Sequence, residues 1–242
     1  MESSEQTVTA TIGSFIDGLK KENPLQEAAV ILVGSVARNA ATANSDLDLL
    51  VIADRVQITR VADRLHIQVL TEAEMLRRLE AGDDFAAWCV RFGIPIVDSG
   101  AWNRIVSAPE AASWPDWRQK TVHAARRLVL ASDLSKSGDQ PAATEELLYA
   151  TSHVGRAVLL KSQVFPLSRP EMITQLKEAG YPHISMILAE LSFGQITEQG
   201  IRQAIAYVKK LLVHLDRAGF EAYSQSRLTA RQRKSVPATT VS

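Results

Sequence analysis

The chain has 242 residues, 46% hydrophobic and 22% charged, a length that suits one large domain or two smaller ones. Its 27 basic and 27 acidic side chains cancel, which excludes a broad nucleic-acid-binding surface. The single cysteine, Cys89, excludes an internal disulfide and fits a reducing cytoplasm. No apolar run approaches the ~20 residues needed to span a bilayer. We therefore expect a cytoplasmic globular protein with no membrane segment.

The first elements lead to a tight turn. Apolar spacing predicts a helix over residues 9–21. Residues 28–33 (AAVILV) are short, apolar and β-branched, which favours a strand buried on both faces. Gly34 then permits a tight turn and a close approach, because it has no Cβ atom. Ser35 is expected to cap the next helical segment, and Arg38 follows one turn later. The N–H groups of this turn and the Arg38 cation would suit a phosphate.

Two acidic residues begin the next strand. Successive strand side chains alternate, so Asp46 and Asp48 are expected on one face and the leucines between them on the core face. Neighbouring carboxylates repel each other unless a cation lies between them, and Mg²⁺ prefers oxygen ligands. Ten residues separate Ser35 from Asp46, giving the pattern GS-x10-D-x-D. An ordinary turn followed by solvated aspartates is the simpler alternative, but the joined pattern favours a magnesium site beside a phosphate cradle.

A further strand is predicted over residues 64–71 (RLHIQVLT). Its apolar residues alternate toward the core, so His66 and Gln68 would face the two aspartates. Thr71 and the glutamate three residues later predict a capping box at the start of the following helix. A second helix is expected to begin at Asp83 and Asp84, and residues 94–97 to form a short strand.

The second half changes character. Residues 99–115 contain glycine and proline and predict a connection. Beyond them strand signals nearly vanish, and helices are expected over residues 118–130, 142–161, 169–179, 182–191 and 198–218. Helices with short breaks favour a bundle. The tail, residues 224–242, is polar, carries no acidic residue and is predicted to be disordered.

The stretch over residues 33–51 (VGSVARNAATANSDLDLLV) resembles the nucleotidyltransferase superfamily that includes DNA polymerase β. It is most similar to the minimal branch that contains the kanamycin nucleotidyltransferase relatives. The resemblance implies that Gly34 and Ser35 contact a triphosphate and that Asp46 and Asp48 bind Mg²⁺. It also implies transfer of an NMP group from an NTP to an acceptor hydroxyl. The second half is similar in pattern to the helical domains of HEPN type that accompany minimal nucleotidyltransferases.

One position departs from this family pattern. The family has a third carboxylate on a later strand, which activates the acceptor hydroxyl and helps to hold the metal. Here the candidate positions are His66 and Gln68, and neither is an acid. A histidine titrates near neutral pH, so His66 is a candidate base, with an ordinary strand histidine as the alternative.

We therefore predict an α+β protein, with a nucleotidyltransferase domain built on a mixed sheet with helices, followed by an all-α helical bundle. The expected bounds are 1–98 for the nucleotidyltransferase domain, 99–115 for the connection, 116–223 for the bundle and 224–242 for the tail. Mg²⁺ is the expected cofactor and ATP the expected NTP. The acceptor, a small molecule or a protein hydroxyl, stays open, as does oligomeric state, a homodimer included. The alternative function is a catalytically degenerate module that binds a nucleotide or a protein partner.

Overall fold

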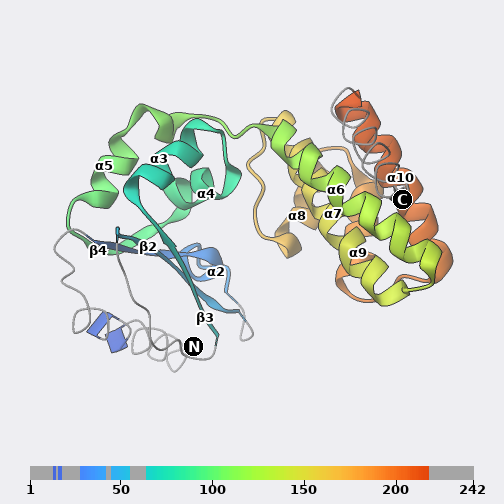
Figure 1. The fold of residues 1–242 in the computed structure, drawn as a ribbon, viewed down its shortest axis with the longest axis horizontal. Helices are drawn as coiled ribbons and strands as arrows, with labels where there is room; N and C mark the ends of the chain where they lie inside the picture. Colours follow the sequence, from blue (N-terminus) through green and yellow to red (C-terminus); the bar gives the residue numbers. More distant parts are fainter. Residues whose placement is uncertain (1–12, 15, 18–27, 42–44, 55–63, 218–242) are drawn as a thin grey trace, which may run out of the picture. The chain divides into compact units, whose positions relative to one another are not determined.

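The computed structural model describes residues 13–14, 16–17, 28–41, 45–54 and 64–217. The chain divides into two compact units, Met1–Pro115 and Asp116–Ser242. The first unit carries a mixed sheet with helices, and the described part of the second is built from helices (Figure 1). The predicted fold class, α+β with a helical second half, is therefore confirmed.

The sheet of the first unit has the strand order β3-β2-β1-β4. The strands are β1 (Ala29–Val33), β2 (Leu47–Ile52), β3 (Leu65–Leu70) and β4 (Ile94–Asp98). β1 pairs antiparallel with both β2 and β4, whereas β2 and β3 run parallel. Because β2 and β3 run in the same direction, their first residues lie side by side. The acidic start of β2 therefore lies next to the start of β3.

Both faces of the central strands are buried. Leu47, Leu49 and Val51 contribute to one apolar cluster, with residues of β1 and β3. On the opposite face, which continues from Asp48, Leu50 is fully buried as well. Helices cover a face of the sheet in Figure 1. The alternation in the sequence predicted one core face for β2, but beyond Asp48 this strand is apolar and buried on both sides.

The helices of the first unit are α2 (Gly34–Ala37), α3 (Glu72–Glu80), α4 (Asp84–Phe92) and α5 (Ala101–Ser107), with a 3-10 helix η2 (Pro109–Ala112). Thr71 caps α3 as predicted, because its Oγ1 atom accepts a hydrogen bond from the N–H of Glu74 at 3.0 Å. The second half of the predicted capping box is wrong: the Glu74 carboxylate accepts from Arg78 at 2.8 Å. Asp83 caps α4 as predicted, accepting from the N–H of Ala86.

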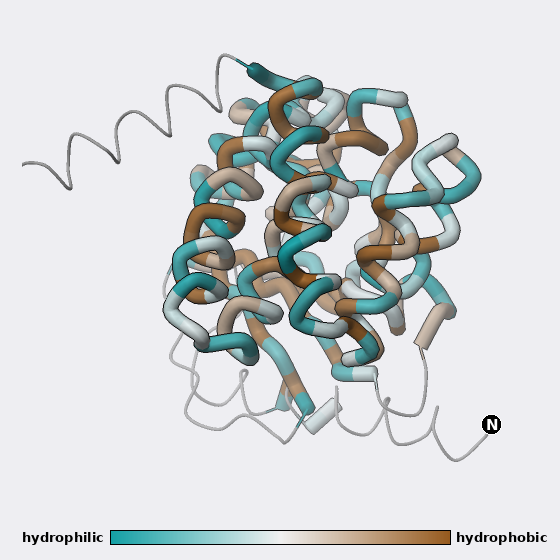
Figure 2. The backbone as a smooth tube through the Cα atoms, turned by 90° about the vertical axis from the view of Figure 1, so that its right-hand side faces the viewer, coloured by the Kyte–Doolittle hydropathy of each residue, from teal (hydrophilic) through white to brown (hydrophobic). Residues whose placement is uncertain are grey.

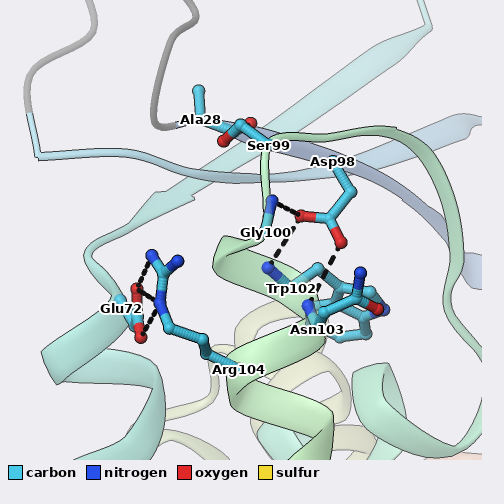
Figure 3. A network of polar contacts seen from close by, with 8 residues as sticks. All are labelled: Ala28, Glu72, Asp98, Ser99, Gly100, Trp102, Asn103 and Arg104. Atoms are coloured by element: carbon cyan, nitrogen blue, oxygen red, sulfur yellow. Dashed lines mark hydrogen bonds and ion pairs between the residues drawn. The ribbon is translucent and has the colours of Figure 1, made fainter.

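Asp98 ends β4 and caps α5 (Figure 3). Its carboxylate accepts three backbone N–H groups, those of Gly100 (2.8 Å), Trp102 (3.0 Å) and Asn103 (3.1 Å). Arg104 of α5 then reaches Glu72 of α3 with two guanidinium nitrogens, the closer at 2.7 Å. Residues 99–115, predicted as a connection, therefore include a helix that is tied to the body of the first unit.

The second unit contains α6 (Trp117–Ser137), α7 (Gln140–Lys161), α8 (Arg169–Glu178), α9 (Pro182–Ser192) and α10 (Glu198–Leu215). Apolar residues from all these helices form one buried cluster. Figure 2 shows hydrophobic and hydrophilic stretches alternating along the helices, as amphipathic packing requires. Gly138, between α6 and α7, has a left-handed backbone conformation with φ of 88°, and Asp139 then caps α7.

Two predicted segments lie largely or wholly outside the described residues. Of the helix expected over residues 9–21, residues 13–14 and 16–17 are described and are helical. The tail over residues 224–242 is outside the described part. Within the part of the chain that the structure describes, no helix combines the length and the apolar character needed to cross a membrane.

Candidate functional site

The turn at Gly34 requires glycine for two reasons. Its φ is 78°, in the left-handed region that residues with a side chain rarely adopt. A Cβ atom added there would lie 2.1 Å from Oδ2 of Asp48. The backbone of Gly34 therefore lies directly against the carboxylate of Asp48. The two halves of the GS-x10-D-x-D pattern, far apart in the sequence, meet at this point.

Ser35 lies two residues deeper in α2 than predicted, at the second helical position instead of the N-cap. The N-cap of this helix is Val33, which offers no side-chain hydrogen bond, so the prediction that the Ser35 hydroxyl caps the helix is wrong. The Ser35 carbonyl accepts hydrogen bonds from the N–H groups of Arg38 and Ala40, at 3.2 and 2.9 Å. These bonds close the short helix into a compact turn directly after β1.

Arg38 follows this helix, and its guanidinium lies over two aromatic rings of α4. The guanidinium carbon is 5.6 Å from the ring centroid of Trp88 and 5.8 Å from that of Phe92. Such contacts hold an arginine side chain in place through the negative face of the ring. Arg38 is therefore anchored on α4, and its predicted role in phosphate binding stays a prediction.

Asp46 and Asp48 flank the start of β2, and His66 lies opposite Asp48 in the parallel register. The Nδ1 atom of His66 is 3.5 Å from Oδ1 of Asp48 and 4.0 Å from Oδ2 of Asp46. The two carboxylates are 43% and 38% exposed, so solvent and a ligand reach both. The structure thus brings together the predicted residues Gly34, Asp46, Asp48 and His66.

Burial and two neighbouring groups change the pKa of the Asp48 carboxyl. Burial raises the pKa of the Asp48 carboxyl above its ordinary value of 3.8, and the neighbouring charge of Asp46 raises it further. The charge of His66 and its hydrogen bond to Asp48 act in the opposite direction and lower this pKa. A partly buried carboxylate whose neighbour repels its charge is stabilised by a cation held between the two.

Gln68 lies farther from the aspartates than His66 does. Its partner in the parallel register is Leu50, two positions beyond Asp48. Neither position of β3 supplies an acid, and among the described residues no three His, Cys, Asp or Glu side chains form a group suited to hold a metal ion. A cation bound here would therefore depend on the two aspartates and on oxygen atoms from a ligand.

Arg64 is a site residue that the sequence reasoning missed. It directly precedes β3, and its Nε atom lies 3.7 Å from Oδ1 of Asp46. Its Nη2 atom donates to the carbonyl of Ser45 at 2.9 Å. The register of β3 against β2 predicts this contact, because it places Arg64, two residues before His66, beside Asp46, two residues before Asp48.

Comparison with known proteins gives one family match. The family model for the "Nucleotidyltransferase domain" matches residues 12–82. This range contains Gly34, Asp46, Asp48, Arg64 and His66. No curated protein matches the chain. Among solved structures, a nucleotidyltransferase-like protein from Exiguobacterium sibiricum is similar over 85% of this chain and 74% of its own, with 20% identity and a TM-score of 0.47. The predicted resemblance to nucleotidyltransferases is confirmed for the N-terminal domain, and the HEPN-like resemblance stays a prediction.

The donor set at the start of β2 fits a hard divalent cation. Asp46 and Asp48 present two carboxylates that both face His66, and burial, more than the charge of Asp46, raises the pKa of Asp48. Proteins commonly hold Mg²⁺ through one or two carboxylates plus substrate phosphates. The close approach of Gly34 to Asp48 leaves backbone rather than a side chain beside this position. A phosphate group bound there would lie next to the carboxylates.

Proposed function

We propose that this protein transfers an NMP group from an NTP to an acceptor hydroxyl, with Mg²⁺ held by Asp46 and Asp48. The observation that carries the proposal is the contact between Gly34 and Asp48, because it joins a backbone turn suited to phosphate to a carboxylate suited to a metal. The match of residues 12–82 to the nucleotidyltransferase domain supports the same class of reaction.

Each residue has a part in the proposed reaction. Asp46 and Asp48 hold the cation, which would polarise the phosphate oxygens and offset the charge that develops on them. Gly34 and Ser35 present backbone N–H groups and a hydroxyl to the triphosphate. Arg38 adds a positive charge one turn away, on a side chain steadied by the rings of α4.

His66 takes the place of the acid that the family pattern has on this strand. Its Nδ1 atom faces both carboxylates, at 3.5 and 4.0 Å, and this contact favours a proton on Nδ1. The other ring nitrogen, Nε2, is then the atom that accepts the proton of the attacking hydroxyl. Gln68 lies two positions farther along β3 and would contact the ligand as a neutral hydrogen-bonding group.

The remaining parts of the proposal concern the ligands. ATP is the nucleotide that we expect, and the acceptor is a hydroxyl of a small molecule or of a protein. A transferase of this kind releases pyrophosphate as the acceptor oxygen attacks the α-phosphorus from the side opposite the leaving group.

The experiment uses the full chain with each of the four NTPs, labelled in turn at the α- or the γ-phosphorus, plus Mg²⁺ and a cell extract as the source of acceptors. Label from the α-position should enter a product, whereas label from the γ-position should leave as pyrophosphate. The variant Asp46→Asn with Asp48→Asn is the matched control and should be inactive. Nucleotide binding without transfer to any acceptor would contradict the enzymatic proposal and favour the degenerate binding module.

A further inference from the structure

Arg64 is tied to the start of β2 by its backbone and by its side chain. Its carbonyl accepts a hydrogen bond from the N–H of Leu47 at 2.8 Å, and its guanidinium donates to the carbonyl of Ser45 at 2.9 Å. Its φ is 67°, a left-handed conformation that is uncommon for any residue other than glycine, asparagine or aspartate. A residue held in this way at a ligand site is a candidate for a functional role.

The guanidinium of Arg64 lies beside the carboxylate of Asp46. Its Nε atom is 3.7 Å from Oδ1 of Asp46, and Nδ1 of His66 is 4.0 Å from the other oxygen of the same carboxylate. Oδ1 of Asp48 also faces His66, at 3.5 Å. Nitrogen atoms of Arg64 and His66 therefore face the Asp46 carboxylate, and His66 also faces that of Asp48.

A divalent cation held by Asp46 would compete with the Arg64 guanidinium for this carboxylate. A cation bound by this carboxylate would repel the guanidinium, because the two positive charges would lie within a few ångströms of each other. The Arg64 side chain is long and 51% exposed, so it has room to move. A triphosphate bound at Gly34 would bring phosphate oxygens next to the Asp48 carboxylate, and guanidinium groups bind phosphate through paired hydrogen bonds.

We propose that Arg64 is a further nucleotide-binding residue that exchanges partners: it neutralises Asp46 before loading and contacts the triphosphate once a divalent cation has taken Asp46. This inference rests on the proposed function. The exchange makes the cation and the nucleotide cooperative, since the cation frees the arginine for the phosphates. By linkage, the nucleotide raises the affinity for the cation by the same factor.

The test measures binding rather than turnover. Calorimetry on the full chain would give the dissociation constant of Mn²⁺ alone, and then that of an ATP analogue with an α,β-methylene bridge at saturating Mn²⁺. Arg64→Asn is the main variant, because asparagine accepts the left-handed backbone and carries no charge. Arg64→Gly is a second variant that fits the same backbone. Arg77→Asn is the matched control, because Arg77 is an exposed arginine of the same unit, 4.0 Å from Glu74.

Without nucleotide, Arg64→Asn should bind Mn²⁺ about five-fold more tightly than wild type, the scale of an exposed ion pair. At saturating Mn²⁺ it should bind the analogue about ten-fold more weakly, the scale of a charge-assisted hydrogen bond. Arg64→Gly should behave in the same way, and Arg77→Asn should match wild type in both titrations.

Two negative results would have different consequences for the exchange and for the proposed function. If wild type binds both ligands and the Arg64 variants keep its Mn²⁺ affinity or weaken it, the exchange is wrong while the proposed function stands. If wild type binds neither Mn²⁺ nor the analogue, the proposed function and the exchange are both overturned. Thermal unfolding of each variant would establish that the compared proteins are folded.

Discussion

The Oδ2 atom of Asp48 lies 2.1 Å from the position that a Cβ atom on Gly34 would occupy. This separation is far below any normal contact, so only a residue without a side chain fits at position 34 while Asp48 keeps its place. The contact joins the end of β1 to the second residue of β2, which pairs with Val33 in the antiparallel register. The geometry of the turn and the position of the carboxylate therefore depend on each other.

A side chain at position 34 should damage binding more than loss of the Ser35 hydroxyl. Gly34→Ala should cost about 1–2 kcal/mol of stability from the left-handed backbone alone. Gly34→Val should cost more and should displace Asp48. Ser35→Ala removes one hydroxyl and leaves the backbone donors in place. Urea denaturation and NTP titration would measure both effects, and equal NTP affinity for Gly34→Val and wild type would show that the turn does not cradle phosphate.

Asp48→Asn should stabilise the protein in the absence of metal, in a pH-dependent way. The pKa of Asp48 is raised in the folded chain, chiefly by burial, so the folded state keeps this proton after the unfolded state has released it. The contribution of Asp48 to stability therefore falls as the pH rises from 3.8 through the folded pKa, and above that pKa it stays constant. Asparagine has no such proton to release.

The melting temperature of Asp48→Asn minus that of wild type, in EDTA, should accordingly increase with pH over this range and then level off. Asp54→Asn, at an exposed aspartate of the same unit, is the control and should not reproduce the trend. A difference that shrinks as the pH rises would contradict the assigned direction of the pKa shift.

Replacing both aspartates should abolish the stabilisation that Mg²⁺ and NTP give together. Asp46→Asn with Asp48→Asn removes both carboxylate ligands and also relieves their repulsion, so the fold should survive. Thermal shift with Mg²⁺ and NTP, each alone and then combined, would test this. Wild type that shows no combined stabilisation would count against the metal site, and an unfolded double variant would indicate a structural role for the aspartates.

The two candidate positions on β3 should respond differently. His66→Ala should lower the transfer rate with little change in nucleotide affinity if His66 is the base. Gln68→Glu should strengthen Mg²⁺ binding by adding an oxygen anion, and His66→Asp should do so more strongly, because position 66 pairs directly with Asp48. Transfer that survives His66→Ala would exclude the histidine base.

Asp98 should matter for stability rather than for chemistry. Its carboxylate accepts three backbone N–H groups at the start of α5, so Asp98→Ala should cost about 1–2 kcal/mol, the scale of a helix cap. Glu72→Gln weakens the exposed pair with Arg104 and should cost less than about 1 kcal/mol. Chemical denaturation would rank the two variants, and a larger cost for Glu72→Gln would contradict this assignment.

Local signals in the sequence predicted much of the fold. Thr71 and Asp83 cap their helices as expected. These features depend on a few neighbouring residues, so a sequence pattern is enough to find them. The predicted end of the first bundle helix at residue 130 is wrong, because α6 continues to Ser137, where Gly138 adopts a left-handed conformation. The predicted partner of the Glu74 carboxylate was wrong, because this carboxylate accepts from the Arg78 guanidinium and not from a backbone N–H at the start of the helix.

Contacts between distant segments could not be predicted from the sequence alone. Alternation placed His66 and Gln68 on one face of β3, but only the register with β2 shows that His66 is the one opposite Asp48. The same register brings Arg64 to Asp46. Arg38 was expected near a phosphate, yet its guanidinium lies over Trp88 and Phe92, fifty or more residues later in the chain.

Cys89 offers a way to follow the two units separately. The thiol is fully buried in α4, and this burial raises its pKa, so thiol reagents should modify it only when the first unit opens. The chain has no other cysteine, so the labelling rate of the native protein reports the opening of that unit alone. Stabilisation by a nucleotide or a metal ion would then appear as slower labelling, whether or not the helical unit responds.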